Sequence, residues 1–323
     1  MQSRSNKQKK GSSREGLGIR KIGSRPASGR RSPRNALVSR AGEAAGVCTV
    51  LSHALEDRRQ IFLRQLARAR RRASEPAIHD LRVALRRLIA ALDLAAVVVP
   101  GTGIRNVRRS LRSSLKQFNT LRDVHIALLA MRGMRSVSPP VRSYSASLRV
   151  RERSLLRECA GTLRSLDVRD LDRELARIQQ TLLTLGTDRH LDVLTGAMIK
   201  GNFARTVARA LVLERAVTAA DASSVHRLRV AFKRVRYASE ILAPLLPWIT
   251  RPRRKWMQAY QTMMGEVQDC EVMLAGVRRF AARPSIRNRI SVLPLQEMLA
   301  RRKRERIDAF MQHAAELEKF WEE

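Results

Sequence analysis

The chain has 323 residues, 44% of them apolar, which is enough for one large folded domain or two smaller ones with a hydrophobic core. Its 64 lysines and arginines against 29 aspartates and glutamates give a net charge of +35, which predicts a polyanionic partner: nucleic acid, an anionic membrane surface or polyphosphate. Aromatic residues make up only 4%, which argues against the recognition of unpaired bases by stacking.

The three cysteines are far apart and odd in number. They predict neither a disulfide framework nor a metal site, and they are compatible with a reducing cytoplasm. No apolar run reaches the ~18 residues that a membrane-spanning helix needs, and no signal-peptide core lies near the N-terminus. We therefore expect a cytoplasmic protein that does not enter a membrane and that needs no metal or cofactor.

Residues 1–34 differ in composition from the rest of the chain. They contain eleven basic residues and one acid, Glu15, among many serines, glycines and prolines. Such a segment cannot bury enough apolar surface to fold, so we predict a disordered basic tail that adds a secondary affinity for nucleic acid. Removing its net charge of +10 from the +35 of the chain leaves +25, so the remainder is basic in its own right.

Residues 35–323 show helical periodicity, with no strict alternation of apolar and polar residues and no Asn-Gly or Asp-Gly hairpin turn. Breaks rich in proline, glycine, serine and aspartate separate the periodic segments. Helices are expected at approximately 37–72, 77–97, 104–134, 140–166, 169–185, 189–219, 224–246, 252–281 and 294–321. The break near Gly186 divides this region into an N-terminal half, 35–186, and a C-terminal half, 187–323. The predicted class is therefore all-α, with two helical bundles packed as one body.

The two halves contain an internal repeat, which indicates a duplication. Residues 79–94 read HDLRVALRRLIAALDL, and residues 226–241 read HRLRVAFKRVRYASEI. Five positions are close substitutions, among them Arg86/Lys233. Seven positions are identical: His79/His226, Leu81/Leu228, Arg82/Arg229, Val83/Val230, Ala84/Ala231, Arg87/Arg234 and Ala91/Ala238.

One face of each copy is apolar, which predicts that this face is buried in the core. In the first copy the face consists of Leu81, Leu85, Leu88 and Leu92. In the second copy it consists of Leu228, Phe232, Val235 and Leu242, with Ser239 as a polar interruption.

A second face of each copy is basic. It consists of His79, Arg82 and Arg86 in the first copy, and of His226, Arg229, Lys233 and Arg236 in the second. Stacked like charges destabilise an isolated helix, so we expect acids from other helices or an anionic ligand to offset them. A solvated basic face is the alternative for a single helix, and its presence in both copies favours the ligand.

A second motif follows each copy at nearly the same distance. It reads Leu121-Arg122-Asp123-Val124 in the first half and Val267-Gln268-Asp269-Cys270 in the second. Together with the pattern H-x-L-R-V-A-[LF]-[RK]-R, these motifs resemble the CHAD family, the conserved histidine α-helical domain, from about residue 36 onward. The resemblance implies two pseudo-two-fold-related bundles around a basic central channel that binds inorganic polyphosphate. It leaves an association with polyphosphate granules open.

The residues expected to bind the polymer lie on the two repeats and on the helix after the first. They are His79, Arg82, Arg86, Arg87, Arg112, Lys116 and Arg122 from the first half, and His226, Arg229, Lys233, Arg234 and Arg236 from the second. The two histidines are expected in the first turn of their helices, where free N–H groups favour anions. Asp123 and Asp269 are interpreted as structural residues that orient arginines through salt bridges.

Two other classes of function stay open. A nucleic-acid-binding protein would place the same cations on phosphate backbones, but the sequence has no helix-turn-helix or other reader motif. An enzyme acting on polyphosphate or nucleotides would need a catalytic or phosphate-loop motif, and the patterns GxxxxGK[ST], GxGxxG and HExxH do not occur. The sequence therefore favours a protein that binds polyphosphate without catalysing a reaction.

Overall fold

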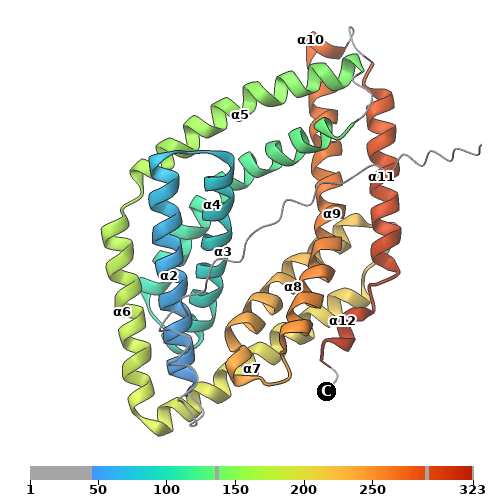
Figure 1. The fold of residues 1–323 in the computed structure, drawn as a ribbon. Helices are drawn as coiled ribbons and strands as arrows, with labels where there is room; N and C mark the ends of the chain where they lie inside the picture. The colour runs from blue at the N-terminus through green and yellow to red at the C-terminus, as the bar shows by residue number, and fades with distance from the viewer. Residues whose placement is uncertain (1–45, 135–137, 288–290, 322–323) are drawn as a thin grey trace, which may run out of the picture. The chain divides into compact units, whose positions relative to one another are not determined.

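The computed structural model describes residues 46–134, 138–287 and 291–321, and every regular element in these ranges is helical (Figure 1). The helices are α2 (Val47–Arg71), α3 (Glu75–Val98), α4 (Thr102–Arg132), α5 (Pro139–Ser165), α6 (Val168–Thr187), α7 (Arg189–Arg215), α8 (Ala222–Leu242), the 3-10 turn η1 (Ala243–Leu245), α9 (Arg251–Ala281), α10 (Pro284–Arg287), α11 (Leu293–Met311) and α12 (Glu316–Lys319). The expected all-α class is confirmed. The predicted tail, 1–34, and residues 37–45 of the first expected helix lie outside the described residues.

Several helices end earlier than their periodicity suggested. The helix expected at 224–246 ends at Leu242 and continues as a 3-10 turn, because Pro244 has no N–H with which to extend the α-helical bonding. The helix expected at 189–219 ends at Arg215. The segment expected as one helix at 294–321 is divided into α11 and α12 by a turn after Met311.

Aspartates determine where several helices begin. The side chains of Asp167, Asp188 and Asp221 accept backbone N–H bonds at the starts of α6, α7 and α8, as helix N-caps do. Another aspartate acts between helices. The Asp192 carboxylate of α7 accepts hydrogen bonds from the backbone nitrogens of Val47, at 3.1 Å, and of Cys48, at 2.8 Å. It therefore caps α2 from the second half of the chain.

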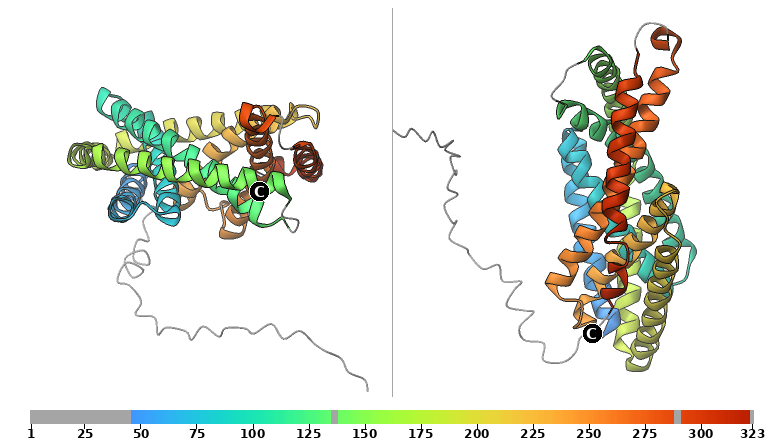
Figure 2. Two further views of the ribbon diagram at one scale, coloured as in Figure 1. Left: turned by 90° about the horizontal axis from the view of Figure 1, so that it is seen from above. Right: turned by 90° about the vertical axis from the view of Figure 1, so that its right-hand side faces the viewer.

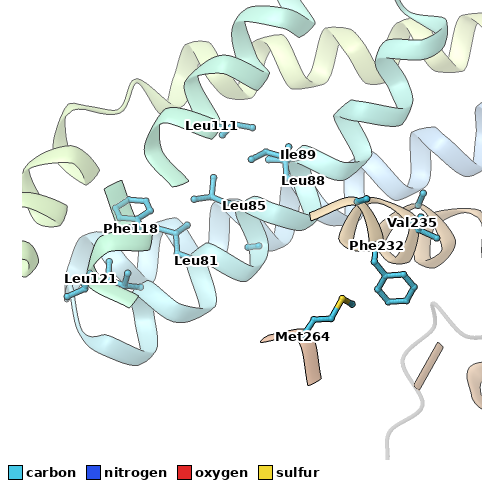
Figure 3. Close-up of a cluster of buried hydrophobic side chains, with 14 of the residues drawn as sticks. Leu81, Leu85, Leu88, Ile89, Leu111, Phe118, Leu121, Phe232, Val235 and Met264 are labelled. Atoms are coloured by element: carbon cyan, nitrogen blue, oxygen red, sulfur yellow. The ribbon is translucent and has the colours of Figure 1, made fainter. Parts of the chain in front are cut away.

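The apolar faces of both repeats are buried, as predicted. Residues with at most 2% exposure include Leu81, Leu85, Leu88 and Leu92 of α3 and Leu228, Phe232, Val235 and Leu242 of α8. Figure 3 shows the α3 leucines beside apolar side chains of α4, namely Leu111, Phe118 and Leu121. Ser239 is also fully buried, and its hydroxyl donates to the Val235 carbonyl oxygen at 3.0 Å. This polar interruption therefore needs no partner from another helix.

The helices that carry the two repeats adjoin each other. Helix α3 packs on α2 and α4, and α8 packs on α7 and α9. Contacts of α3 with α7 and α8, and of α4 with α9, join the first set to the second (Figure 1 and Figure 2). All of the described helices belong to one compact unit. In the part of the chain that the structure describes, no helix is both long enough and apolar enough to cross a membrane.

Candidate functional site

The basic faces of the two repeats meet. Lys233 of α8 lies within electrostatic reach of four arginines, one from its own helix, two from α3 and one from α4. We refer to these five residues as the cationic cluster: Arg82, Arg86, Arg122, Arg229 and Lys233. Three of them come from the first half of the chain and two from the second, so the fold brings side chains of both halves into one site.

Burial among like charges lowers the pKa values of several cluster residues. The pKa of Lys233 is lowered to about 6, first by burial and then by the charges of the other four cluster residues. Burial, with the charges of Arg86 and Arg122, lowers the pKa of Arg82 to about 9. Burial is also the main cause that lowers the pKa values of Arg86 and Arg229. The fully protonated cluster is therefore an unfavourable arrangement that a nearby anion would stabilise.

Among the described residues, Arg122 is the one cluster member that forms ion pairs with carboxylates, although Asp123 also attracts Arg82 and Arg86, and Asp269 attracts Arg229. The Arg122 guanidinium donates to Asp269 of α9 at 2.5 Å and lies 3.2 Å from Asp123, so these two acids hold an arginine in place as interpreted from the sequence. The neutral Asn119 Oδ1 of α4 accepts hydrogen bonds from two other cluster arginines, at 2.9 and 3.3 Å. Among the described residues, the remaining four cluster members form no ion pair with a carboxylate.

Two guanidinium nitrogens of the cluster are buried without a hydrogen-bond partner in the described ranges. They are the Nε atoms of Arg82 and Arg229, which occupy the same position in the two repeats. Arg82 is only 3% exposed, and a buried donor left without an acceptor costs about 1–3 kcal/mol. A ligand with several acceptor oxygens would offset this cost.

Two cavities border four of the five cluster residues, and Arg229 lines neither of them. The larger, of about 530 Å³, is lined by basic residues that include Arg86, Arg108, Arg112, Lys233 and Arg234. The smaller, of about 410 Å³, is lined by His79, Arg82, Arg86 and Arg122 among others. Arg86 lines both cavities, so its side chain borders each of them.

The other predicted arginines and Lys116 differ in their surroundings. Arg112 lines the larger cavity but is paired with Asp93 at 2.8 Å. Arg234 also lines this cavity, and within the described ranges it has no ion-pair partner. Lys116 is exposed on α4 and lines neither of the two cavities.

The basic face of the second repeat ends at Lys233 rather than at Arg236. Arg236 is 8% exposed, and its guanidinium donates to Glu240 at 2.5 Å and to Gln261 at 2.8 Å. Arg87 Nε lies 3.8 Å from the same Glu240 carboxylate. This acid, four residues after Arg236, attracts both arginines, and neither of them lines the two cavities.

The two histidines occupy equivalent positions slightly further along their helices than expected. His79 and His226 are each the fifth residue of their helix, beyond the free N–H groups of the first turn. Both are exposed. His79 Nδ1 lies 3.2 Å from the Asp80 carboxylate and lines the smaller cavity, whereas His226 Nδ1 contacts the side-chain oxygen of Gln268. Gln268 occupies the position in the second motif that Arg122 has in the first, and it contacts His226.

Sequence reasoning missed several polar side chains at the site. Asn119 lies three residues before Arg122 and so shares its helix face, a signal that was present in the sequence. Asn202 and Thr206 of α7 and Tyr237 of α8 line the larger cavity. Helix α7 lies outside the repeat, and the sequence signal for its role was the pair Arg205 and Arg209, which are four residues apart and share one face. Within the described ranges, no three histidine, cysteine or acidic side chains are placed to hold a metal ion.

Comparison with known proteins identifies the family. A family model described as the CHAD domain matches residues 53–278, which include both repeats and both following motifs. The CHAD domain from the plant Ricinus communis is 19% identical, with a TM-score of 0.59 over 86% of this chain and 91% of that one. PptA from Streptomyces chartreusis is 15% identical, with a TM-score of 0.57 over 86% of this chain and 100% of that one.

At these identities the two solved structures establish similarity of the fold alone. None of the curated proteins matches the sequence. The family model covers well over half of the chain, from residue 53 to residue 278. The protein therefore belongs to the CHAD domain family.

Proposed function

We propose that the protein binds inorganic polyphosphate in the cavities around the cationic cluster and catalyses no reaction on the polymer. The observation that carries this proposal is the set of five converging basic side chains of which, among the described residues, only Arg122 forms an ion pair with a carboxylate. Every phosphate of the polymer brings negative charge and acceptor oxygens that would add to those of Asn119, Asp123 and Asp269. Charge-assisted hydrogen bonds of this kind contribute about 1.5–3 kcal/mol each.

Because the cluster is buried, it favours a polymer that is narrow enough to enter a cavity. Arg82 is 3% exposed, so a ligand must enter a cavity to reach its guanidinium. Polyphosphate carries no sugar or base, whereas nucleic acid would have to bring both. Proteins that bind single strands usually stack bases on aromatic side chains, and of the described residues lining the two cavities only Tyr237 has such a ring.

A competition assay tests the choice of polymer. Labelled nucleic acid, single- or double-stranded, is bound to the protein and displaced by polyphosphate at equal phosphate concentration, and the reverse experiment is run in parallel. We expect polyphosphate to displace nucleic acid and not the reverse, with affinity falling steeply as salt increases because counterions are released on binding. Displacement in the opposite sense would support the alternative, a protein that contacts nucleic-acid backbones without sequence preference.

Two further measurements test the remaining parts of the proposal. Incubation with short and long polyphosphate and Mg²⁺ should release no phosphate above the level of a protein-free control, and sustained release would assign an enzymatic function. In cells that form polyphosphate granules, we expect a fluorescent fusion to lie in the cytoplasm on these granules. A uniform distribution that does not change when polyphosphate is depleted would contradict that location.

A further inference from the structure

A third cavity adjoins the larger of the two described above. It has a volume of about 210 Å³ and lies between α7 and α8. Three of its lining residues, Asn202, Thr206 and Arg234, also line the larger cavity. Arg205 and Arg209 of α7 complete its basic lining. Neighbouring cavities therefore share lining residues: Arg86 borders the first two, and Asn202, Thr206 and Arg234 border the larger and the third.

The third cavity is positively charged without compensation. Arg205, Arg209 and Arg234 are exposed, and none forms an ion pair within the described residues. No acidic side chain is among the lining residues. Three guanidinium groups beside an amide and a hydroxyl make a set of hydrogen-bond donors suited to phosphate oxygens.

Other arginines near these cavities do form ion pairs with acidic residues. Arg108 and Arg112 share the Asp93 carboxylate, at 2.5 and 2.8 Å. Arg87 and Arg236 share the carboxylate of Glu240. Within the described residues, basic side chains without an ion pair therefore extend from Lys233 through Arg234 to Arg205 and Arg209 of α7.

We infer that a long polyphosphate chain continues from the cationic cluster onto α7, where Arg205 and Arg209 bind it and make affinity depend on chain length. This inference rests on the proposed function and extends it. A short polymer contacts the cluster alone, whereas a longer one also contacts α7. Because the α7 arginines are exposed, each contributes less than a buried cluster residue.

The test compares two variants against two ligands. The first variant is Arg205→Ser/Arg209→Ser. The second is the control Arg149→Ser/Arg153→Ser, which removes two exposed arginines at the same spacing from α5, outside the three cavities. The ligands are tripolyphosphate and long-chain polyphosphate, titrated at several salt concentrations. Circular dichroism and thermal melting establish that both variants are folded.

We expect the α7 variant to lose affinity for long-chain polyphosphate on the order of tenfold, a loss typical of two exposed charges. A plot of the logarithm of its affinity against the logarithm of salt concentration should be shallower by about 0.7 for each arginine that no longer binds a phosphate, as for single-stranded polyanions. Affinity for tripolyphosphate, and both affinities of the control, should be unchanged.

Two negative outcomes are distinguishable. If the wild-type protein binds long-chain polyphosphate but the α7 variant binds it equally well, or loses affinity for both ligands to the same extent, this inference alone is wrong. If the wild-type protein binds neither ligand, the proposed function fails and the inference fails with it.

Discussion

Arg122 of α4 donates a hydrogen bond of 2.5 Å to Asp269 of α9, a residue 147 positions later in the chain. Asp269 is the counterpart, in the second motif, of Asp123, which lies 3.2 Å from the same guanidinium. One arginine thus joins the matching acids of both motifs. This pairing connects α4 to α9 and brings negative charge from the protein into the cationic cluster.

Removing the negative charge of Asp269 should lower the stability of the fold without weakening polyphosphate binding. Asp269 is 26% exposed at its side chain, and a hydrogen bond to a charged group of this kind contributes about 1.5–3 kcal/mol. We expect Asp269→Asn to lower the free energy of unfolding by roughly that amount, as measured by urea denaturation without ligand. The same variant should bind polyphosphate at least as tightly as wild type, because an anion that competes for Arg122 has been removed.

The control for this variant is Asp308→Asn on α11, an exposed aspartate without an ion pair among the described residues. Its stability should stay within about 0.5 kcal/mol of wild type. A variant of Asp269 that keeps full stability but loses affinity would show that this acid positions Arg122 for the ligand rather than supporting the fold.

Lys233 should make stability and binding depend on pH. Burial first, and then the four cluster arginines, lower its pKa from 10.5 to about 6 in the folded protein. Between these values the unfolded chain holds a proton that the folded chain lacks, so stability rises with pH across the window and falls as the pH approaches 6. A bound polyanion favours the protonated amine, so binding should take up a proton and become tighter as the pH falls toward 6.

Calorimetry in buffers of different ionisation enthalpy measures this proton uptake. Lys233→Arg is the matched variant, because a guanidinium stays protonated more readily than the Lys233 amine and because His79 and His226 are left in place. We expect proton uptake by wild type near neutral pH and a smaller uptake by the variant. Equal uptake by the two proteins would assign the effect to other groups.

The buried faces of the repeats should dominate stability. Leu88 and Phe232 are fully buried, and truncating such side chains costs about 2–5 kcal/mol for leucine and 3–5 kcal/mol for phenylalanine. We expect Leu88→Ala and Phe232→Ala to shift the urea midpoint accordingly. Leu129→Ala is the control, because Leu129 is 69% exposed, and its effect should stay within about 0.5 kcal/mol. Similar small effects at all three positions would contradict the assignment of the core.

Much of this arrangement follows from the duplicated sequence. The helical period alone assigns Leu81, Leu85 and Leu88 to a buried face, and the structure confirms this. The same period places Arg82 and Arg86 on another face, beside which Asn119 of the next helix lies. Such local patterns are readable because residues on one face of a helix recur at fixed spacing.

Contacts between distant segments were not predictable in this way. Asp192 caps α2 from 145 positions away, and no local signal marks a carboxylate for that role. The pairing of Arg236 with Glu240, four residues later in the same helix, could have been read from the sequence, whereas the attraction of Arg87 of α3 to Glu240 depends on how α3 and α8 pack. The α7 residues at the site were missed for the same reason, because their place beside the cluster is set by tertiary packing.

The most direct test of the central claim is the affinity of Arg86→Glu/Lys233→Glu for long-chain polyphosphate. Arg86 and Lys233 occupy the same position in the two repeats and line the same cavity, so the variant reverses one charge from each half. Arg149→Glu/Arg153→Glu on α5 makes the same charge change away from the cavities. We predict that binding is abolished in the first variant and largely retained in the second, with both folded by circular dichroism. A folded cluster variant that binds polyphosphate as tightly as wild type would contradict the proposal that the two basic faces together hold the polymer.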